Sequence, residues 1–155
     1  MVSNGTTSIG HGKRRSERGT AMLEAAVTLP ILLLIAVGIF EFGRAYQTWQ
    51  VLTNAAREGA RISVLPGSTN SGVQTRARAY MTSGQLSNAG SARIDVDRSI
   101  TIQVNGANAP ASQVTVQYPF NFIVLQPVAR LINRNSQTGS SLTMVASAVM
   151  RNEGQ

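Results

Sequence analysis

Residues 20–40 read TAMLEAAVTLPILLLIAVGIF, and this stretch decides how the chain is organised. It contains a single charged side chain, Glu24. As an α-helix rising about 1.5 Å per residue it would be roughly 31 Å long, which matches the hydrocarbon core of a bilayer at about 30 Å. The stretch therefore predicts a transmembrane helix over residues 20–40.

The charges on either side of this stretch predict its orientation. Lys13, Arg14, Arg15 and Arg18, opposed by Glu17, precede it within six residues, whereas the nearest charges after it cancel. Positive flanks stay in the cytoplasm. We therefore expect a single-pass protein of the inner (cytoplasmic) membrane, with a cytoplasmic N-terminus and an extracytoplasmic, periplasmic C-terminal part.

The composition excludes several classes of function. The chain has 155 residues and a net charge of +7, no Cys, and one His, His11. The lack of Cys excludes disulfides, thiol nucleophiles and zinc-thiolate sites. The single His lies in a Gly-flanked N-terminal stretch, which argues strongly against a Ser-His-Asp triad or a multi-His metal site. The Arg residues after residue 65 are dispersed, which argues against a nucleic-acid groove. We expect no enzymatic activity, no cofactor, no metal and no small-molecule substrate; Asp95 and Asp97 could form a metal pair, but a solvated strand face is the favoured interpretation.

Three interpretations of the N-terminal region compete. A secretory signal peptide could be cut after Ala36-Val37-Gly38, although apolar residues continue beyond that site. A plain membrane anchor is the second interpretation. In the third, residues 1–19 form a basic prepilin-type leader that is removed between Gly19 and Thr20.

Glu24 lies inside the apolar stretch, five residues after Gly19. A charge at the centre of a membrane helix carries a penalty of roughly 2.5–3.5 kcal/mol, so a partner is expected. After cleavage the new amine of Thr20 on a neighbouring subunit would provide one. The alternative is that Glu24 snorkels to the cytoplasmic interface.

Pro30 interrupts the same helix pattern. It removes one backbone donor and crowds the carbonyl of residue 26, which predicts a kink or a loosened turn. The kink could let the helix flex as it leaves the bilayer for a polymer, or it could simply be tolerated, as is common in membrane helices.

Residues 41–64 predict an amphipathic continuation of the helix, which brings the whole helix to residues 20–64. One stripe recurs at helical spacing and comprises Phe42, Tyr46, Trp49, Ala56 and Ala60. This stripe could pack on the chain's own domain or on other subunits, and we leave both open. Tyr46 and Trp49 would also suit a membrane interface.

Residues 65–155 predict an exported α+β domain. A helix is expected at residues 72–83, with Val73, Ala77, Tyr80 and Met81 on one side. Strands are expected at residues 94–97, 100–104, 114–118 and 142–151. Asn105-Gly106 signals a turn, which residues 107–111 would lengthen beyond a tight hairpin. Pro119 is expected to end its strand. Phe120 and Phe122 are expected to supply core aromatics, and residues 126–134 a short helical turn.

Together these elements predict an α+β fold in which a long N-terminal transmembrane and amphipathic helix packs on a small antiparallel sheet. The sheet should lean on residues 46–64 of the helix, because a domain of this size is marginal for a core of its own. This is the general plan of a type IV pilin.

The segment from Arg18 to Arg61 resembles the TadE-like family of minor pilins or pseudopilins of tight-adherence (Flp-type) pilus systems. The resemblance rests on Arg18-Gly19, Glu24, Leu29-Pro30, the run EFGR at residues 41–44 and the run NAAREGAR at residues 54–61. Major Flp pilins typically have Glu-Tyr where this chain has Glu24-Ala25, and they carry almost no exported domain. Both departures favour a minor component.

The resemblance implies a membrane protein that a prepilin peptidase cuts after Gly19 and that takes part in assembling a type IV-like pilus. Its partners would be other pilins or pseudopilins, proteins of the assembly platform and the peptidase. The alternative is a single-pass anchored scaffold or receptor domain unrelated to pili.

Overall fold

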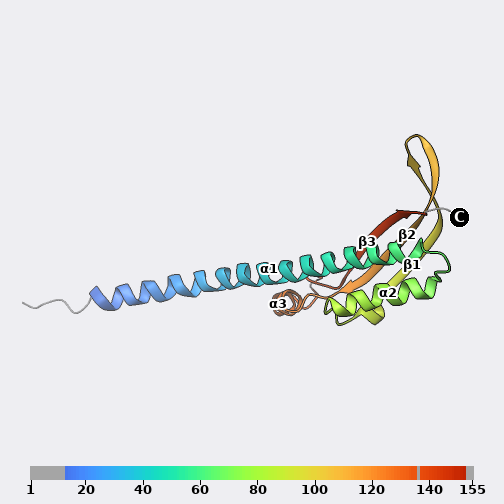
Figure 1. Cartoon of the computed structure of the whole chain (residues 1–155). Coiled ribbons are helices and arrows are strands. Elements are labelled where there is room, and N and C mark those ends of the chain that lie inside the picture. The colour runs from blue at the N-terminus through green and yellow to red at the C-terminus, as the bar shows by residue number, and fades with distance from the viewer. Residues whose placement is uncertain (1–12, 136, 153–155) are drawn as a thin grey trace, which may run out of the picture. The chain divides into compact units, whose positions relative to one another are not determined.

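The computed structural model describes residues 13–135 and 137–152. In chain order the elements are α1 (Lys13–Ser63), α2 (Asn70–Ser83), the 3-10 helix η1 (Ala89–Ser91), β1 (Arg93–Val104), β2 (Ala107–Phe120), α3 (Leu125–Ile132) and β3 (Leu142–Arg151) (Figure 1). The chain divides into two units, residues 1–39 and residues 40–155. Most of the expected leader, with His11, lies outside the described residues.

The long helix α1 differs from expectation at its start. It begins at Lys13, ahead of Thr20, because the run KRRSER consists largely of good helix formers. It continues through Pro30 as one helix. It ends at Ser63, where Pro66 and Gly67, the latter with a φ of 73°, prevent continuation.

The three strands form one antiparallel sheet in the order β1-β2-β3. Val104 pairs with Ala107, so Asn105 and Gly106 are the whole connection between β1 and β2. Their φ values of 51° and 80° are those that a two-residue hairpin turn of the favoured type requires. The expectation of a longer connection was wrong, because residues 107–111 already belong to β2.

Two other strand boundaries also correct the sequence-based expectation. Residues 94–104 form one strand with a register shift between Asp97 and Ile100, not two strands. β2 continues through Pro119 to Phe120. Proline is tolerated there because β1 ends opposite Gln117, and only Thr143 of β3 pairs with Pro119.

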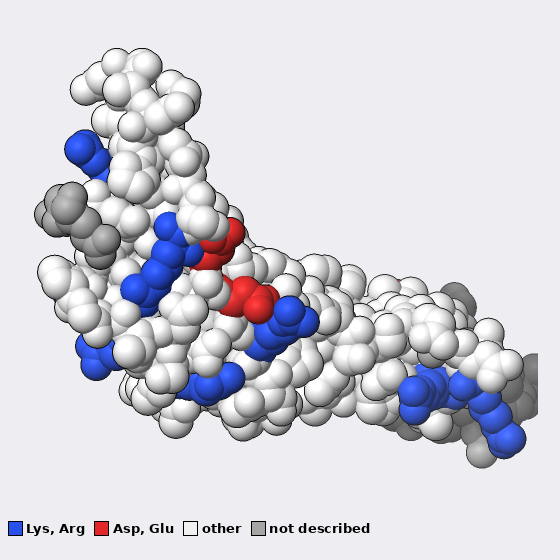
Figure 2. All heavy atoms as spheres, turned by 90° about the vertical axis from the view of Figure 1, so that its right-hand side faces the viewer, with Lys and Arg blue, Asp and Glu red and all other residues white. Residues whose placement is uncertain are grey.

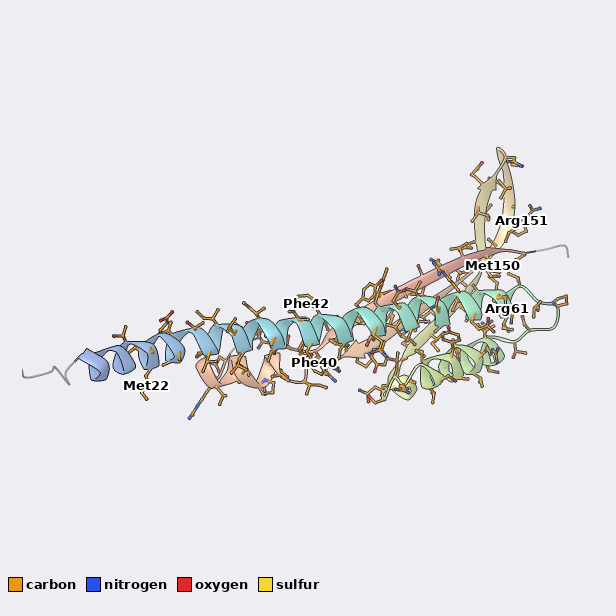
Figure 3. The ribbon with its side chains drawn as sticks, turned by 60° about the vertical axis from the view of Figure 1, so that its left-hand side comes forward. Met22, Phe40, Phe42, Arg61, Met150 and Arg151 are labelled. Carbon is orange, nitrogen blue, oxygen red and sulfur yellow. The ribbon has the colours of Figure 1, made fainter. Side chains whose placement is uncertain are left out.

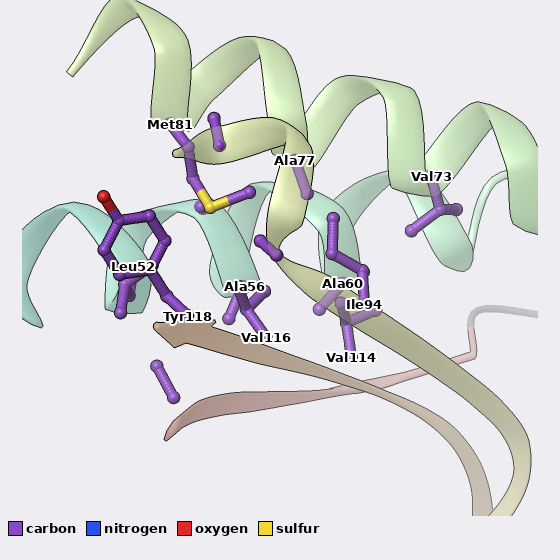
Figure 4. Close-up of a cluster of buried hydrophobic side chains, with 14 of the residues drawn as sticks. Leu52, Ala56, Ala60, Val73, Ala77, Met81, Ile94, Val114, Val116 and Tyr118 are labelled. Carbon is purple, nitrogen blue, oxygen red and sulfur yellow. The ribbon is translucent and has the colours of Figure 1, made fainter. Parts of the chain in front are cut away.

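The core lies where α1 and α2 meet one face of the sheet (Figure 4). Its buried side chains include Leu52, Ala56 and Ala60 from α1, Val73, Ala77 and Met81 from α2, Ile94 from β1, and Val114, Val116 and Tyr118 from β2. Small residues on α1 allow close approach: a Cβ at Gly59 would lie 3.0 Å from Cγ1 of Val114. The expected α+β fold, with the helix packed on the sheet, is confirmed.

The expected packing stripe on α1 needs a correction. Ala56 and Ala60 are fully buried, but Phe42, Tyr46 and Trp49 are 74%, 62% and 48% exposed. The aromatic part of the stripe therefore does not pack on the chain's own domain. The buried face runs instead through Glu41, Thr48, Leu52, Ala55 and Gly59, about a quarter of a turn away at about 100° per residue. On α2, Tyr80 is likewise 39% exposed.

Candidate functional site

The first candidate region is the apolar part of α1. Among the described residues α1 is the one helix long and apolar enough to cross a membrane, with a mean hydropathy of 2.4 over its best 18-residue window. None of that window is buried. Large apolar side chains such as Met22, Leu23 and Ile39 are at least 70% exposed, and Figure 3 shows the side chains projecting from the ribbon along this part of the helix. A lipid bilayer is the solvent that suits such a surface.

Gly19, Thr20, Glu24 and Pro30 all lie within this helix. Thr20 and Glu24 are exposed, and at a spacing of four residues they share one face. A cut after Gly19 would therefore place a new amine one helical turn from the carboxylate. The roles of these four residues in cleavage, assembly and helix kinking stay predictions.

The second region is built around Glu41, at the start of the unit formed by residues 40–155. Glu41 is only 1% exposed to solvent. Oε1 accepts hydrogen bonds from the backbone N–H groups of Ile123, Val124 and Leu125 at 2.7, 2.5 and 3.4 Å. Oε2 accepts one from Nη1 of Arg44 at 2.8 Å. One carboxylate thus joins α1 to a segment more than 80 residues later in the chain.

The sequence of α3 explains why this carboxylate is needed. The first N–H groups of a helix have no partner within the helix, and an acceptor near them is usually a Ser, Thr, Asp or Asn at the N-cap. In α3 the N-cap is Val124, which cannot provide one, and the first turn contains no acidic residue. Glu41 supplies the missing acceptor, and its negative charge suits the positive end of the helix dipole.

Arg44 extends the contact to the end of β2. Its guanidinium lies 5.2 Å from the ring centroid of Phe120, within the range of a cation–π interaction. Phe120 in turn meets Phe122 edge to face, with ring centroids 5.2 Å apart. Glu41, Arg44, Phe120, Phe122 and the N–H groups at residues 123–125 are hereafter called the Glu41 clamp.

The electrostatics of the clamp favour an ionised carboxylate. Burial by itself raises the pKa of Glu41. The hydrogen bonds from the backbone N–H groups of Val124, Leu125 and Ile123, together with the charge of Arg44, lower the pKa by more than burial raises it. The net result is a pKa below the usual 4.5. Glu41 is therefore a charged acceptor for the N–H groups at the start of α3 at neutral pH.

Sequence reasoning did not find the clamp. Glu41 counts there only as a balancing charge and as part of the EFGR run. The available signal was its position: Glu41 lies on the same helical face as Thr48, Leu52 and Ala55, so an acidic residue stands in line with core residues. Its partners could not be identified in the same way, because backbone N–H groups leave no trace in a sequence.

A pocket of about 270 Å³ lies beside the clamp. It is lined by Arg44, Gln47 and Thr48 of α1, by residues 84–88, by residues 118–121 and by Ile123. The charged residue in this lining is Arg44, and its guanidinium is already held by Glu41 and Phe120. The lining offers neither a nucleophile with an adjacent base nor a set of metal ligands.

The carboxylates of Glu58, Asp95 and Asp97 make local contacts. Glu58 contacts Arg61 at 3.0 Å and Arg76 of α2 at 2.9 Å, and hydrogen bonds from these two arginines lower its pKa to about 2. Asp95 pairs with Arg93, and Asp97 accepts hydrogen bonds from Ser99. Both aspartates are exposed, and each bonds to a residue two positions away on its own strand, which fits a solvated strand face. On the face seen in Figure 2, blue side chains are scattered among others, without one continuous basic surface.

A comparison with known families covers the apolar part of α1 and the α1 residues of the Glu41 clamp. Residues 19–61 match the family model described as TadE-like protein. The chain is similar to this family over these residues, which are less than half of its length. The resemblance expected from the sequence is thereby confirmed for this segment. No curated protein and no solved structure matches the chain.

The extent of the TadE-like match is informative. It begins at Gly19, the residue of the expected cleavage site, and ends at Arg61, close to the end of α1. It includes Glu24, Pro30, Glu41 and Arg44. The α3 half of the Glu41 clamp and the whole sheet lie outside it.

Proposed function

We propose that this protein is a non-enzymatic minor pilin or pseudopilin that takes part in assembling a tight-adherence (Flp-type) pilus. In this proposal a prepilin peptidase cuts the chain after Gly19 on the cytoplasmic side of the inner membrane. Residues 20–40 then hold the mature protein in the membrane, and the domain after residue 65 stands outside it. The partners are other pilins or pseudopilins and the assembly platform.

The observation that carries the proposal is the start of the TadE-like match at Gly19. This glycine stands where a basic, polar segment meets an apolar helix, and Glu24 follows one turn beyond Thr20. A carboxylate in an apolar helix needs a partner. The amine that cleavage would create on a neighbouring subunit meets that need only when subunits pack together, so Glu24 would couple processing to assembly.

The exported part of α1 supports contacts with other subunits. Phe42, Tyr46 and Trp49 leave the core face and remain exposed, as three aromatic side chains along one side of the helix. Tyr46 and Trp49 contact each other with ring centroids 6.4 Å apart. Aromatic side chains are common anchors at protein interfaces. We assign this aromatic stripe to packing on other pilus subunits.

The deciding experiment is to determine the N-terminus of the membrane-resident protein from cells that contain a prepilin peptidase. A mature chain that begins at Thr20 supports the proposal. A Gly19→Val variant should remain uncut, whereas the matched variant Gly38→Val, at a glycine whose Cβ position is equally open, should be cut normally. A wild-type chain that still begins at Met1 would contradict the processing step and favour an anchored scaffold unrelated to pili.

A second experiment tests Glu24. The Glu24→Ala variant should insert into the membrane as well as the wild type, because it removes a charge from an apolar helix. Pilus assembly should fall, because the partner for the Thr20 amine is lost. Normal piliation in this variant would refute the assigned role.

A further inference from the structure

The segment that the Glu41 clamp holds carries an unusual surface. Leu131 of α3 is 87% exposed, the highest value for a large apolar side chain among the described residues, and Ile123 is 57% exposed. Pro127 and Arg130 of α3 are exposed as well, and helical spacing places Pro127, Arg130 and Leu131 on one side of α3. Ile123 precedes the helix and Arg134 follows it, and both are exposed. We call these five residues the α3 surface. In water, such exposure of Leu131 and Ile123 would be unfavourable.

The clamp joins this surface to the residue that follows the apolar stretch. Glu41 directly follows the apolar stretch that ends at Phe40. Its contacts of 2.5–3.4 Å with residues 123–125 hold the start of α3 against that first residue beyond the stretch. A bilayer extends about 5–8 Å beyond its hydrocarbon core as the headgroup layer. If residues 20–40 span the membrane, the start of α3 is joined to the first residue beyond the hydrocarbon core and would lie within that layer or at its edge.

The charge of the segment also suits a lipid surface. From residue 98 to residue 152 the chain contains no Asp or Glu, while Arg130 and Arg134 both belong to the α3 surface. A short amphipathic helix with exposed Leu or Ile and with Arg beside them is typical of elements that lie in a membrane interface. Arginine side chains there attract anionic headgroups.

We propose that α3 is a second membrane contact of this protein, which lies flat in the headgroup layer on the side where residue 41 emerges. Ile123 and Leu131 enter the boundary of the acyl chains, and Arg130 and Arg134 bind anionic lipid headgroups. The Glu41 clamp joins this contact to α1, so the sheet is held at a set height above the bilayer. The proposal rests on the membrane span of residues 20–40 and adds a site that the TadE-like match does not include.

The absence of cysteine makes a direct test practical. Single cysteines replace Leu131, Leu33 within the span and Leu65 in the loop after α1. All three leucines are exposed. Each full-length variant is spin-labelled and reconstituted in nanodiscs of phosphatidylcholine with phosphatidylglycerol, and accessibility to oxygen and to a water-soluble nickel complex gives the label's depth. We expect a deep label at Leu33, an aqueous label at Leu65 and a shallow but membrane-embedded label at Leu131.

A charge variant tests the choice of lipid. Arg130→Gln with Arg134→Gln should shift the label at Leu131 toward water, with a loss of up to about 30-fold in the embedded population for two basic side chains near an anionic surface. Arg57→Gln with Arg151→Gln is the matched control, because both residues are exposed and lie outside the α3 surface. Nanodiscs of pure phosphatidylcholine should have the same effect as the Arg130 and Arg134 changes.

The outcomes separate the inference from the function on which it rests. An aqueous label at Leu33 would overturn the membrane span, and the α3 contact with it. A deep label at Leu33 with an aqueous label at Leu131 would overturn the α3 contact alone. The α3 contact would also be overturned if the label at Leu131 were shielded from water to the same extent with and without anionic lipid, and more strongly with more protein copies per disc. A protein partner would then cover the surface.

Discussion

Replacing Glu41 by alanine should detach α3 from α1 while leaving the rest of the unit formed by residues 40–155 folded. The change removes an acceptor from three backbone N–H groups and a charge partner from Arg44. At the N-cap position itself, Val124 makes no side-chain hydrogen bond. The buried core cluster runs from Leu52 to Ala146 and contains no described residue of α3, although Phe120 of the clamp belongs to it.

The size of the effect follows from these contacts. A hydrogen bond to a charged group contributes roughly 1.5–3 kcal/mol, and loss of an N-cap costs about 0.5–2 kcal/mol. The three donors share one oxygen, and the segment is half-exposed, so water can partly replace the carboxylate. We expect about 3 kcal/mol of local stability to be lost in Glu41→Ala, and about half of that in Glu41→Gln, which keeps a neutral acceptor.

Amide hydrogen exchange on the full-length protein in nanodiscs measures this directly. A loss of about 3 kcal/mol should accelerate exchange at residues 123–125 by roughly 100-fold, because each 1.4 kcal/mol corresponds to a factor of ten. Glu58→Gln is the control: it removes the pairs with Arg61 and Arg76 but touches neither α3 nor the clamp. Core amides in β2 should stay protected in all variants.

The reasoning fails if Glu41→Ala leaves exchange at residues 123–125 unchanged while the protein remains folded. It also fails if the change opens the β2 core as readily as α3, because the clamp would then be part of the global fold and not a local connection. An effect of Glu58→Gln on α3 equal to that of Glu41→Ala would contradict the assignment to the carboxylate of Glu41.

Three further predictions follow from the geometry. The pKa of Glu58 is lowered from 4.5 to about 2, so its ion pairs contribute stability that is fully present above about pH 4.5 and is lost as the pH falls toward 2. The stability of Glu58→Gln should therefore fall less steeply with pH in this range than that of the wild type, as acid unfolding would show. Gly84→Ala should destabilise the unit by about 1–3 kcal/mol in chemical unfolding, since its Cβ would lie 2.6 Å from Cγ1 of the β-branched Val51, whereas Gly90→Ala, with open space, should change stability by less than about 0.5 kcal/mol. Gly106→Ala places a Cβ at a φ of +80° and should lower stability by about 1–2 kcal/mol, which the same unfolding curves would show; an unchanged midpoint would contradict the tight hairpin.

Much of the fold could be predicted from local patterns. The apolar stretch at residues 20–40, the helix that became α2 and the strand at residues 142–151 depend on periodicity, which neighbouring residues reveal. Turn chemistry at Asn105-Gly106 was recognised, but the length of the connection was not, because Ala107 to Ala111 have weak preferences until β1 pairs with them. Pro119 was misread because its tolerance depends on where the neighbouring strand ends.

In the candidate site, too, residues that are close together in the chain could be predicted, and contacts between distant residues could not. Gly19, Thr20, Glu24 and Pro30 belong to one continuous motif, and a sequence displays their spacing in full. Glu41 was visible as a residue but not as a cap, because its donors are main-chain groups that arrive after a separation of more than 80 residues.

The amino-acid sequence by itself determined the membrane-length helix, its charged flank, the TadE-like motif and the alternation of the strands, since each depends on residues near one another in the chain. Only the tertiary structure decided which face of α1 turns inward beyond residue 40. Hydrophobicity favoured the aromatic face of Phe42, Tyr46 and Trp49, yet the buried face of α1 consists of Leu52 and the small residues Ala55, Ala56, Gly59 and Ala60. A Cβ at Gly59 would already lie 3.0 Å from Cγ1 of Val114. The smaller side chains allow closer contact between α1 and the rest of the domain. With that face buried, the aromatic residues remain exposed and Glu41 faces the start of α3.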